Sequence, residues 1–183
     1  IIIGATYSNI DNYGISAKAL SIGGIKSFEN NASSLITNPA SLKKMPQFSF
    51  NAMSFPLLNN TANYFGVAFG YKAKGIPLAF IMTRINSKTI KHTARNINNE
   101  TVIKELFDYN KYSLKAGTQL SYNDFLSVGG SITGFYHQIF TTIGRGINAD
   151  AGIFLEFNKL QLSFSYINLI KGLKIQYSNG YFQ

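Results

Sequence analysis

Cysteine and tryptophan are both absent from the 183 residues. Without cysteine the chain can form no disulfide and offers no thiolate as a nucleophile or metal ligand. Charge is scarce too, because charged residues make up 14% of the sequence, well below the roughly 25% that is usual in soluble domains. The few charges are mostly basic, with 17 Lys and Arg against 8 Asp and Glu. The composition therefore departs from that of a typical water-soluble domain.

A long apolar run of the kind that forms a membrane-spanning helix is also missing. The stretch from Met45 to Tyr71 carries no charged residue and is long enough to cross a bilayer as a helix. However, Pro46, Pro56 and several Asn and Ser lie between its apolar residues, so it is uncharged without being apolar. This combination predicts strands that have one apolar and one polar face.

Alternation of apolar and polar residues with a period of two predicts about seven strands. In KYSLKAGTQLSY, for example, Leu114 and Leu120 fall on one face, whereas Ser113 and Gln119 fall on the other. The predicted strands are 47–55, 63–71, 76–84, 111–122, 125–138, 147–157 and 160–166, with a possible eighth at 172–177. The predicted fold class is therefore all-β.

Short and long connections alternate along these strands. Short turns are predicted at 72–75, 122–124 and 158–159, and longer loops at 57–62, 85–110 and 139–146. An antiparallel meander with its short turns at one rim and its long loops at the other is the arrangement of an outer-membrane β-barrel. We therefore expect a barrel whose partner is the lipid bilayer.

The polar faces of the strands carry small uncharged side chains where a solvent-facing strand would carry Lys, Glu and Arg. Such side chains suit a crowded lumen, and the residues predicted to face it are Ser113, Lys115, Gly117, Gln119, Ser131, Asn148, Asp150 and Glu156. Five strand glycines share this face: Gly66, Gly70, Gly117, Gly129 and Gly152. Glycine within a strand often marks the close approach of another segment. We expect that segment to be NASSLITNPASL, residues 31–42, which reads as one short helix interrupted by an Asn-Pro step.

The N-terminal stretch GISAKALSIGGIKSFENNASSLITNPASL also resembles a family signature, which runs roughly R-A-x-A-M-G-G-A-F-x-A-x-A-D-D-x-S-A-x-x-x-N-P-A-G-L. Lys18 stands in place of the usual Arg, and Ile22-Gly23-Gly24 matches the M-G-G step. Asn30-Asn31 stands in place of the acidic pair, Asn38-Pro39-Ala40 matches, and Ser41-Leu42 replaces Gly-Leu. Residues 14–42 therefore resemble the PorV/PorQ proteins and their relatives among the FadL-like outer-membrane barrels. Residues 166–169 are similar to an aromatic-x-Asn-Leu strand end common in that group.

This resemblance implies a roughly fourteen-stranded barrel of the bacterial outer membrane with an N-terminal hatch inside it. It also implies either transport of hydrophobic small molecules or a part in type IX secretion with secreted proteins as partners. We expect residues 1–45 to form the hatch and 46–183 the barrel strands. Within the hatch, Gly23 and Gly24 would allow tight packing, Asn31 belongs to the motif, Asn38 would join the hatch to the wall, and Pro39 would fix the following backbone angle.

The length is short for such a barrel. After the hatch is removed, about 138 residues remain, enough for about seven strands. An eight-stranded barrel is filled by its own side chains and has no room for a hatch. We therefore expect these 183 residues to be the N-terminal part of a longer protein, with seven or eight of about fourteen strands.

No catalytic constellation is present, so we predict no enzyme, no catalytic residue, no metal site and no cofactor. His92 and His137 have no metal-ligand spacing, and Asp150 and Glu156 lie about 20 Å apart along one strand, too far for a glycosidase pair. One alternative is a soluble β-sandwich or lipocalin-like carrier of small apolar ligands. It is favoured by the absence of Trp, which is common at membrane interfaces, although Tyr and Phe can take its place.

A nucleic-acid binder is a third possibility, suggested by the net charge of +9 and the many aromatic residues. Most of its basic residues fall in predicted turns and loops, however, and no strand face interleaves basic with aromatic residues. We therefore expect no nucleic acid as a partner.

Overall fold

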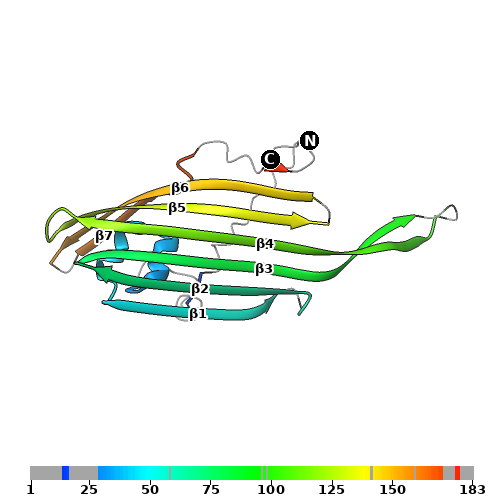
Figure 1. The fold of residues 1–183 in the computed structure, drawn as a ribbon, viewed down its shortest axis with the longest axis horizontal. Coiled ribbons are helices and arrows are strands. Elements are labelled where there is room, and N and C mark those ends of the chain that lie inside the picture. The colour runs from blue at the N-terminus through cyan, green and yellow to red at the C-terminus, as the bar shows by residue number, and fades with distance from the viewer. Residues whose placement is uncertain are drawn as a thin grey trace.

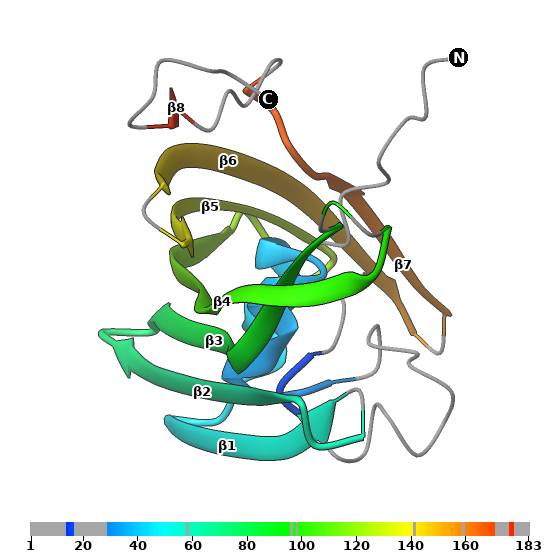
Figure 2. The same ribbon diagram turned by 90° about the vertical axis from the view of Figure 1, so that its right-hand side faces the viewer.

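The computed structural model describes residues 14–16, 29–57, 59–95, 97, 99–140, 142–158, 160–170 and 176–177. Its main feature is a single antiparallel sheet in which each of seven strands pairs with the next along the chain. The sheet curls into a half-barrel (Figures 1 and 2). The all-β antiparallel meander predicted from the sequence is therefore confirmed.

The strands are β1 (Phe48–Leu57), β2 (Ala62–Ala73), β3 (Ile76–Arg95), β4 (Thr101–Ser121), β5 (Leu126–Ile139), β6 (Thr142–Phe157), β7 (Leu160–Tyr166) and the two-residue β8 (Gln176–Tyr177). β8 pairs with Gly144 and Arg145 of β6. The tight turn between β2 and β3 places Lys74 and Gly75 at positive φ, as a two-residue hairpin turn requires.

The predicted loop at 85–110 is wrong, because β3 and β4 continue through it as paired strands. They pair as far as Arg95 and Thr101, and the hairpin extends well beyond the neighbouring strands (Figure 1). The Thr, Ile, Val and Phe residues of this segment favour strands. The predicted loop at 139–146 is wrong as well, since β5 ends at Ile139 and β6 begins at Thr142.

The described part of the hatch, residues 14–16 and 29–45, lies against the concave face of the sheet (Figure 2). In place of the one interrupted helix that we predicted, it forms two short 3-10 helices, η2 (Ala32–Ile36) and η3 (Pro39–Lys44). Asn31 and Asn38 are their N-caps. Neither helix is long and apolar enough to cross a membrane, and the same is true of every helix in the described part of the chain.

The two faces of the sheet differ in polarity. A small apolar core lies on the concave face between the hatch and strands β2 and β3; it consists of Ile15, Ala32, Leu35, Ile36, Leu42, Met45, Ala68, Ala79 and Ile81. Most of the large apolar side chains of the sheet are instead exposed on the convex face. The hydrophobic surface of this sheet is therefore mainly its outer surface.

Four residues of the convex face form a continuous line across β3 to β6. Arg84 pairs with Tyr112, Tyr112 with Tyr136, and Tyr136 with Arg145. We call these four residues the Arg–Tyr row. It separates the extended β3–β4 hairpin from the part of the sheet that ends at the short turns.

Candidate functional site on the concave face

The eight residues predicted to face a lumen all lie on the concave face, on the same side as the hatch. Ser113, Lys115, Gln119, Ser131, Asn148 and Asp150 are buried, while Gly117 and Glu156 are partly exposed. Three of the five predicted hatch-motif residues, Asn31, Asn38 and Pro39, are in the described part of the hatch. The other two, Gly23 and Gly24, lie outside the described residues.

The five strand glycines predicted to receive the hatch do face it. Gly66 lies against Ile15, Gly70 against Ala32 and Met45, Gly117 against Leu35, and Gly129 and Gly152 against residues 38–40. Each glycine thus lies where a side chain would collide with the hatch. The prediction that the hatch packs on these glycines is confirmed, although the residue at Gly66 is Ile15 and not one of residues 31–42.

The start of η3 lies against Gly129 and Gly152, which are paired across β5 and β6. A Cβ at Gly129 would lie 2.5 Å from the carbonyl carbon of Pro39 and from the amide nitrogen of Ala40. A Cβ at Gly152 would overlap the Asn38 side-chain oxygen. At Gly129 the contacting atoms are backbone, which cannot move aside as a flexible side chain can, and at Gly152 they are the Asn38 amide and the Pro39 ring. The start of η3 fits in this position because both wall residues lack side chains.

Asn38 joins the hatch to the wall through both ends of its amide. Its Oδ1 accepts a hydrogen bond from the Ala40 amide at 2.8 Å and caps η3. Its Nδ2 lies 2.7 Å from Ser163 Oγ and 3.0 Å from the carbonyl oxygens of Ile153 and Phe164. Because Ile153 and Phe164 are paired residues of β6 and β7, this one side chain spans the seam between two strands.

Two further hydrogen bonds attach the hatch at the other side of the half-barrel. The Ala32 amide donates to Ser49 Oγ on β1 at 3.0 Å. The Tyr64 hydroxyl on β2 donates to the Gly14 carbonyl at 2.6 Å, and Tyr64 is fully buried. Bonds at β1, β2, β6 and β7 therefore hold the hatch across the whole width of the sheet.

A buried polar network lies beside the hatch on β4, β5 and β6. Lys115 Nζ is 3.0 Å from Asp150 Oδ2, and the two side chains are 3% and 4% exposed. Asp150 also accepts hydrogen bonds from Ser131 Oγ at 3.2 Å and from the backbone N–H of Asn168 at 2.9 Å. Asn168 follows β7 with a positive φ, and its side chain accepts from Asn148. Both carboxylate oxygens of Asp150 are thus hydrogen-bonded, as a buried charge requires.

Glu156 contacts the last turn of η3 near the short-turn rim. Its carboxylate lies 3.3 Å from Lys44 Nζ and 3.8 Å from Lys43 Nζ. These side chains are about a fifth to a third exposed, and exposed ion pairs contribute little to stability. Glu156 therefore positions the end of the hatch more than it stabilises the fold.

The arrangement is one for holding a segment in place, and no chemistry follows from it. Among the described residues, no group of three or more His, Asp or Glu could hold a metal ion. Sequence reasoning missed Ser49, Ser163 and Asn168, which bind the hatch or the network. Only Asn168 carried a signal, since it is the Asn of the aromatic-x-Asn-Leu strand end.

Comparison with family models, curated proteins and solved structures gives no match to this chain.

Valine at Gly129 should displace the hatch, because its Cβ would collide with the backbone of Pro39 and Ala40. Gly130 is the matched control, since it points to the convex face and an added Cβ would meet only the Asp150 carbonyl oxygen, at 3.9 Å. We expect trypsin to cleave after Lys43 and Lys44 several-fold faster in Gly129→Val than in Gly130→Val, as measured by mass spectrometry. Equal rates in the two variants would show that the hatch does not rest on Gly129.

Lys115→Met should destabilise the fold strongly, because it leaves the Asp150 carboxylate buried without its cation. Breaking a buried ion pair in this way costs about 3–5 kcal/mol. Adding Asp150→Asn removes the uncompensated charge and should restore part of the loss. The free energy of unfolding in urea measures both effects, and a double variant no more stable than Lys115→Met would contradict this account.

Proposed function

We propose that residues 46–183 form part of the wall of a bacterial outer-membrane β-barrel, and residues 1–45 its hatch, as in the PorV/PorQ and FadL-like proteins that the N-terminal signature resembles. The observation that carries this proposal is the reversed polarity of the sheet. Its convex face is apolar, whereas its concave face holds the buried ion pair and the hydrogen bonds to the hatch. Membrane barrels alternate apolar-out and polar-in along every strand.

One part of the convex face, between the Arg–Tyr row and the short-turn rim, is suited to contact with lipid. We call this part the apolar band and describe the row as its upper edge. Between that row and the short-turn rim, the described convex-face residues of β2 to β6 include no Lys, Arg, His, Asp or Glu. The large exposed apolar side chains there include Phe69, Leu78, Phe80, Met82, Leu114, Leu120, Val128, Ile132, Ile147, Ile153 and Phe157. Soluble proteins rarely expose a contiguous apolar patch above a few hundred Å².

The height of this apolar band also fits a bilayer. At about 3.3 Å per residue and a tilt of about 40°, the strand from Tyr112 to Leu120 rises about 20 Å, and that from Arg145 to Phe157 about 30 Å. These values bracket the band of about 25 Å found in outer-membrane barrels. Aromatic residues mark its lower edge, where Phe125 stacks on Phe157 with ring centroids 5.7 Å apart.

The alternative of a soluble carrier fits the structure less well. A lipocalin-like carrier of apolar ligands needs an apolar concave face that is open to its ligand. Here that face is occupied by the hatch and by the Lys115–Asp150 pair.

Within the barrel, the hatch would control passage of hydrophobic compounds. Its attachment favours this role, because several separate hydrogen bonds and partly exposed ion pairs hold it. No covalent link joins it to the described wall apart from the chain itself. A secretion-associated component, in which the hatch stays in place, is the second possibility that the resemblance implies.

Arginine in the apolar band should impair membrane assembly of the full-length protein. Leu114→Arg and Leu106→Arg make a matched pair, because both leucines lie on β4, an even number of residues apart, and are 61% and 55% exposed. Only Leu114 lies below the Arg–Tyr row. We expect Leu114→Arg to cost about 2–4 kcal/mol near the midplane and Leu106→Arg to cost little.

Folding into bilayers, followed by the heat-modifiable mobility of the protein in gels, measures both variants. A water-soluble protein would tolerate both substitutions, since each leucine would already be in water. Equal tolerance would therefore exclude the barrel.

Asn38→Ala should loosen the hatch while leaving the strands formed, because the sheet ladder does not pass through its side chain. Asn31→Ala is the control, since Asn31 caps η2 and bonds to Ser33 within the hatch. We expect Asn38→Ala to raise uptake of a hydrophobic compound by vesicles containing the full-length protein, with unchanged circular dichroism, and Asn31→Ala to raise it less. Unaltered uptake in Asn38→Ala would contradict the gating role and favour the secretion-associated one.

A further inference from the structure

The Arg–Tyr row carries two cations at the upper edge of the apolar band. The Arg84 guanidinium lies over the Tyr112 ring, 5.2 Å from its centroid, and that of Arg145 lies 5.9 Å from the Tyr136 centroid. The two tyrosine rings are 5.9 Å apart. Stacking on the rings therefore holds two positive charges at one level of the convex face.

Neither arginine is neutralised by the described part of the chain. No carboxylate there lies within ion-pair distance of either guanidinium. Arg84 makes one long hydrogen bond, 3.4 Å to Asn110 Oδ1, and its buried Nε has no partner among the described residues. The two positive charges, on the partly exposed Arg84 and the exposed Arg145, therefore have no counter-ion in the described part of the chain.

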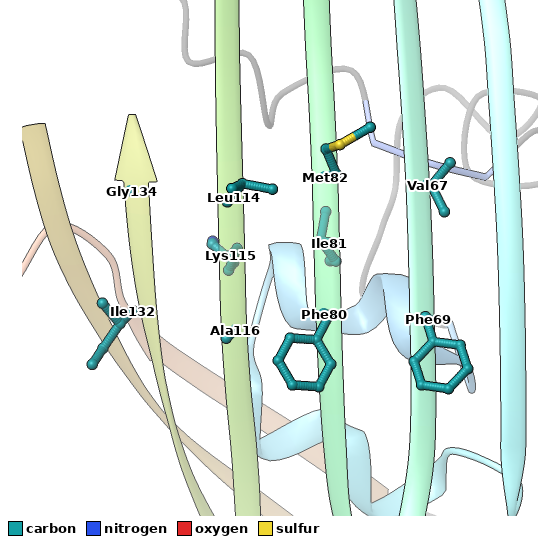
Figure 3. Close-up of a pocket in the computed structure, with 10 residues that line it drawn as sticks. All are labelled: Val67, Phe69, Phe80, Ile81, Met82, Leu114, Lys115, Ala116, Ile132 and Gly134. Atoms are coloured by element: carbon teal, nitrogen blue, oxygen red, sulfur yellow. The ribbon is translucent and has the colours of Figure 1, made fainter. Parts of the chain in front are cut away.

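An apolar groove of about 580 Å³ opens directly beneath the row. Its convex-face lining comes from the next two levels of the sheet, with Met82, Leu114 and Gly134 in the upper level and Phe80, Ala116 and Ile132 in the lower (Figure 3). The small residues Ala116 and Gly134 leave space between the larger side chains, and a Cβ added at Gly134 would meet nothing within 4 Å. The groove therefore exists because two positions lack bulky side chains.

We propose that the Arg–Tyr row and the groove together bind one anionic phospholipid, with its phosphate at Arg84 and Arg145 and an acyl chain in the groove. This inference rests on the proposed membrane location of the convex face. The charges select the occupant, since two cations above an uncharged apolar groove complement a lipid with an anionic head and an apolar tail. A wholly apolar peptide helix in the same groove would leave both arginines without a counter-ion.

The test uses lipids with brominated acyl chains, which quench tryptophan on contact. Phe80→Trp places the reporter in the groove, and Phe164→Trp places it on the convex face of β7, away from the row. The full-length protein without either substitution gives the background. Vesicles contain brominated phosphatidylglycerol or brominated phosphatidylcholine, so the ratio of the two quenching constants reports preference for the anionic head.

We expect the groove tryptophan to prefer phosphatidylglycerol by about 30-fold, because each of the two basic groups near an anionic headgroup is worth about 1 kcal/mol, or about five-fold. The tryptophan on β7 should show a ratio near one. Arg84→Gln combined with Arg145→Gln should bring the groove ratio to about one while phosphatidylcholine still quenches, which confirms that the variant is folded. Gly134→Leu should lower quenching in the groove, whereas Gly130→Leu should not.

Equal ratios at the two tryptophans, or a groove ratio that survives both Gln substitutions, would overturn the lipid site and leave the membrane location intact. Quenching of neither tryptophan by either lipid would instead overturn the membrane location itself.

Discussion

The close approach of residues 38–40 of the hatch to the wall at Gly129 and Gly152 is the constraint on which the rest of the structure depends. A methyl group at either position would hold the start of η3 away from β5 and β6. Asn38 would then lose its reach to the carbonyl oxygens of Ile153 and Phe164. The cap of η3, the cover over the β6–β7 seam and the filling of the concave face therefore follow from the absence of two side chains.

The concave face of the sheet carries polar side chains, and the hatch that fills this face buries them. A charge such as Asp150 is costly to bury, and it is stable here because Lys115, Ser131 and Asn168 together provide its cation and its hydrogen-bond donors. Since the hatch supplies only a small apolar core, against β2 and β3, most large apolar side chains remain on the convex face. Such a sheet is stable when its convex face contacts an apolar solvent or an apolar partner.

Period-two alternation was sufficient to predict the strands, their faces and the concave position of residues such as Lys115 and Asp150, because the side-chain period of a strand does not depend on its neighbours. The strand glycines were equally informative, because glycine within a strand often marks the close approach of another segment. What alternation could not predict was the extent of β3 and β4, where lysines on a two-stranded hairpin look like those of a loop. Alternation could not predict the Arg–Tyr row either. It requires the register of four strands, and Arg84 and Arg145 are far apart in the sequence.

The register also fixes the depth of the hatch relative to the apolar band. Leu35 packs on Gly117, five residues and about 17 Å along β4 from Tyr112, and η3 ends beside Glu156 near the short turns. Residues 31–45 of the hatch therefore lie in the half of the band nearer the short-turn rim, whereas Ile15 packs on Gly66, next to the level of the row. The concave face near the row also carries Lys111 and Lys115. In the proposed barrel, Ile15 of the hatch and the buried Lys111 and Lys115 would lie nearer the hairpin rim than η2 and η3 do. The two helices of the hatch would then control passage in the half of the interior nearer the short turns, where Gly117, Gly129 and Gly152 hold them against the wall.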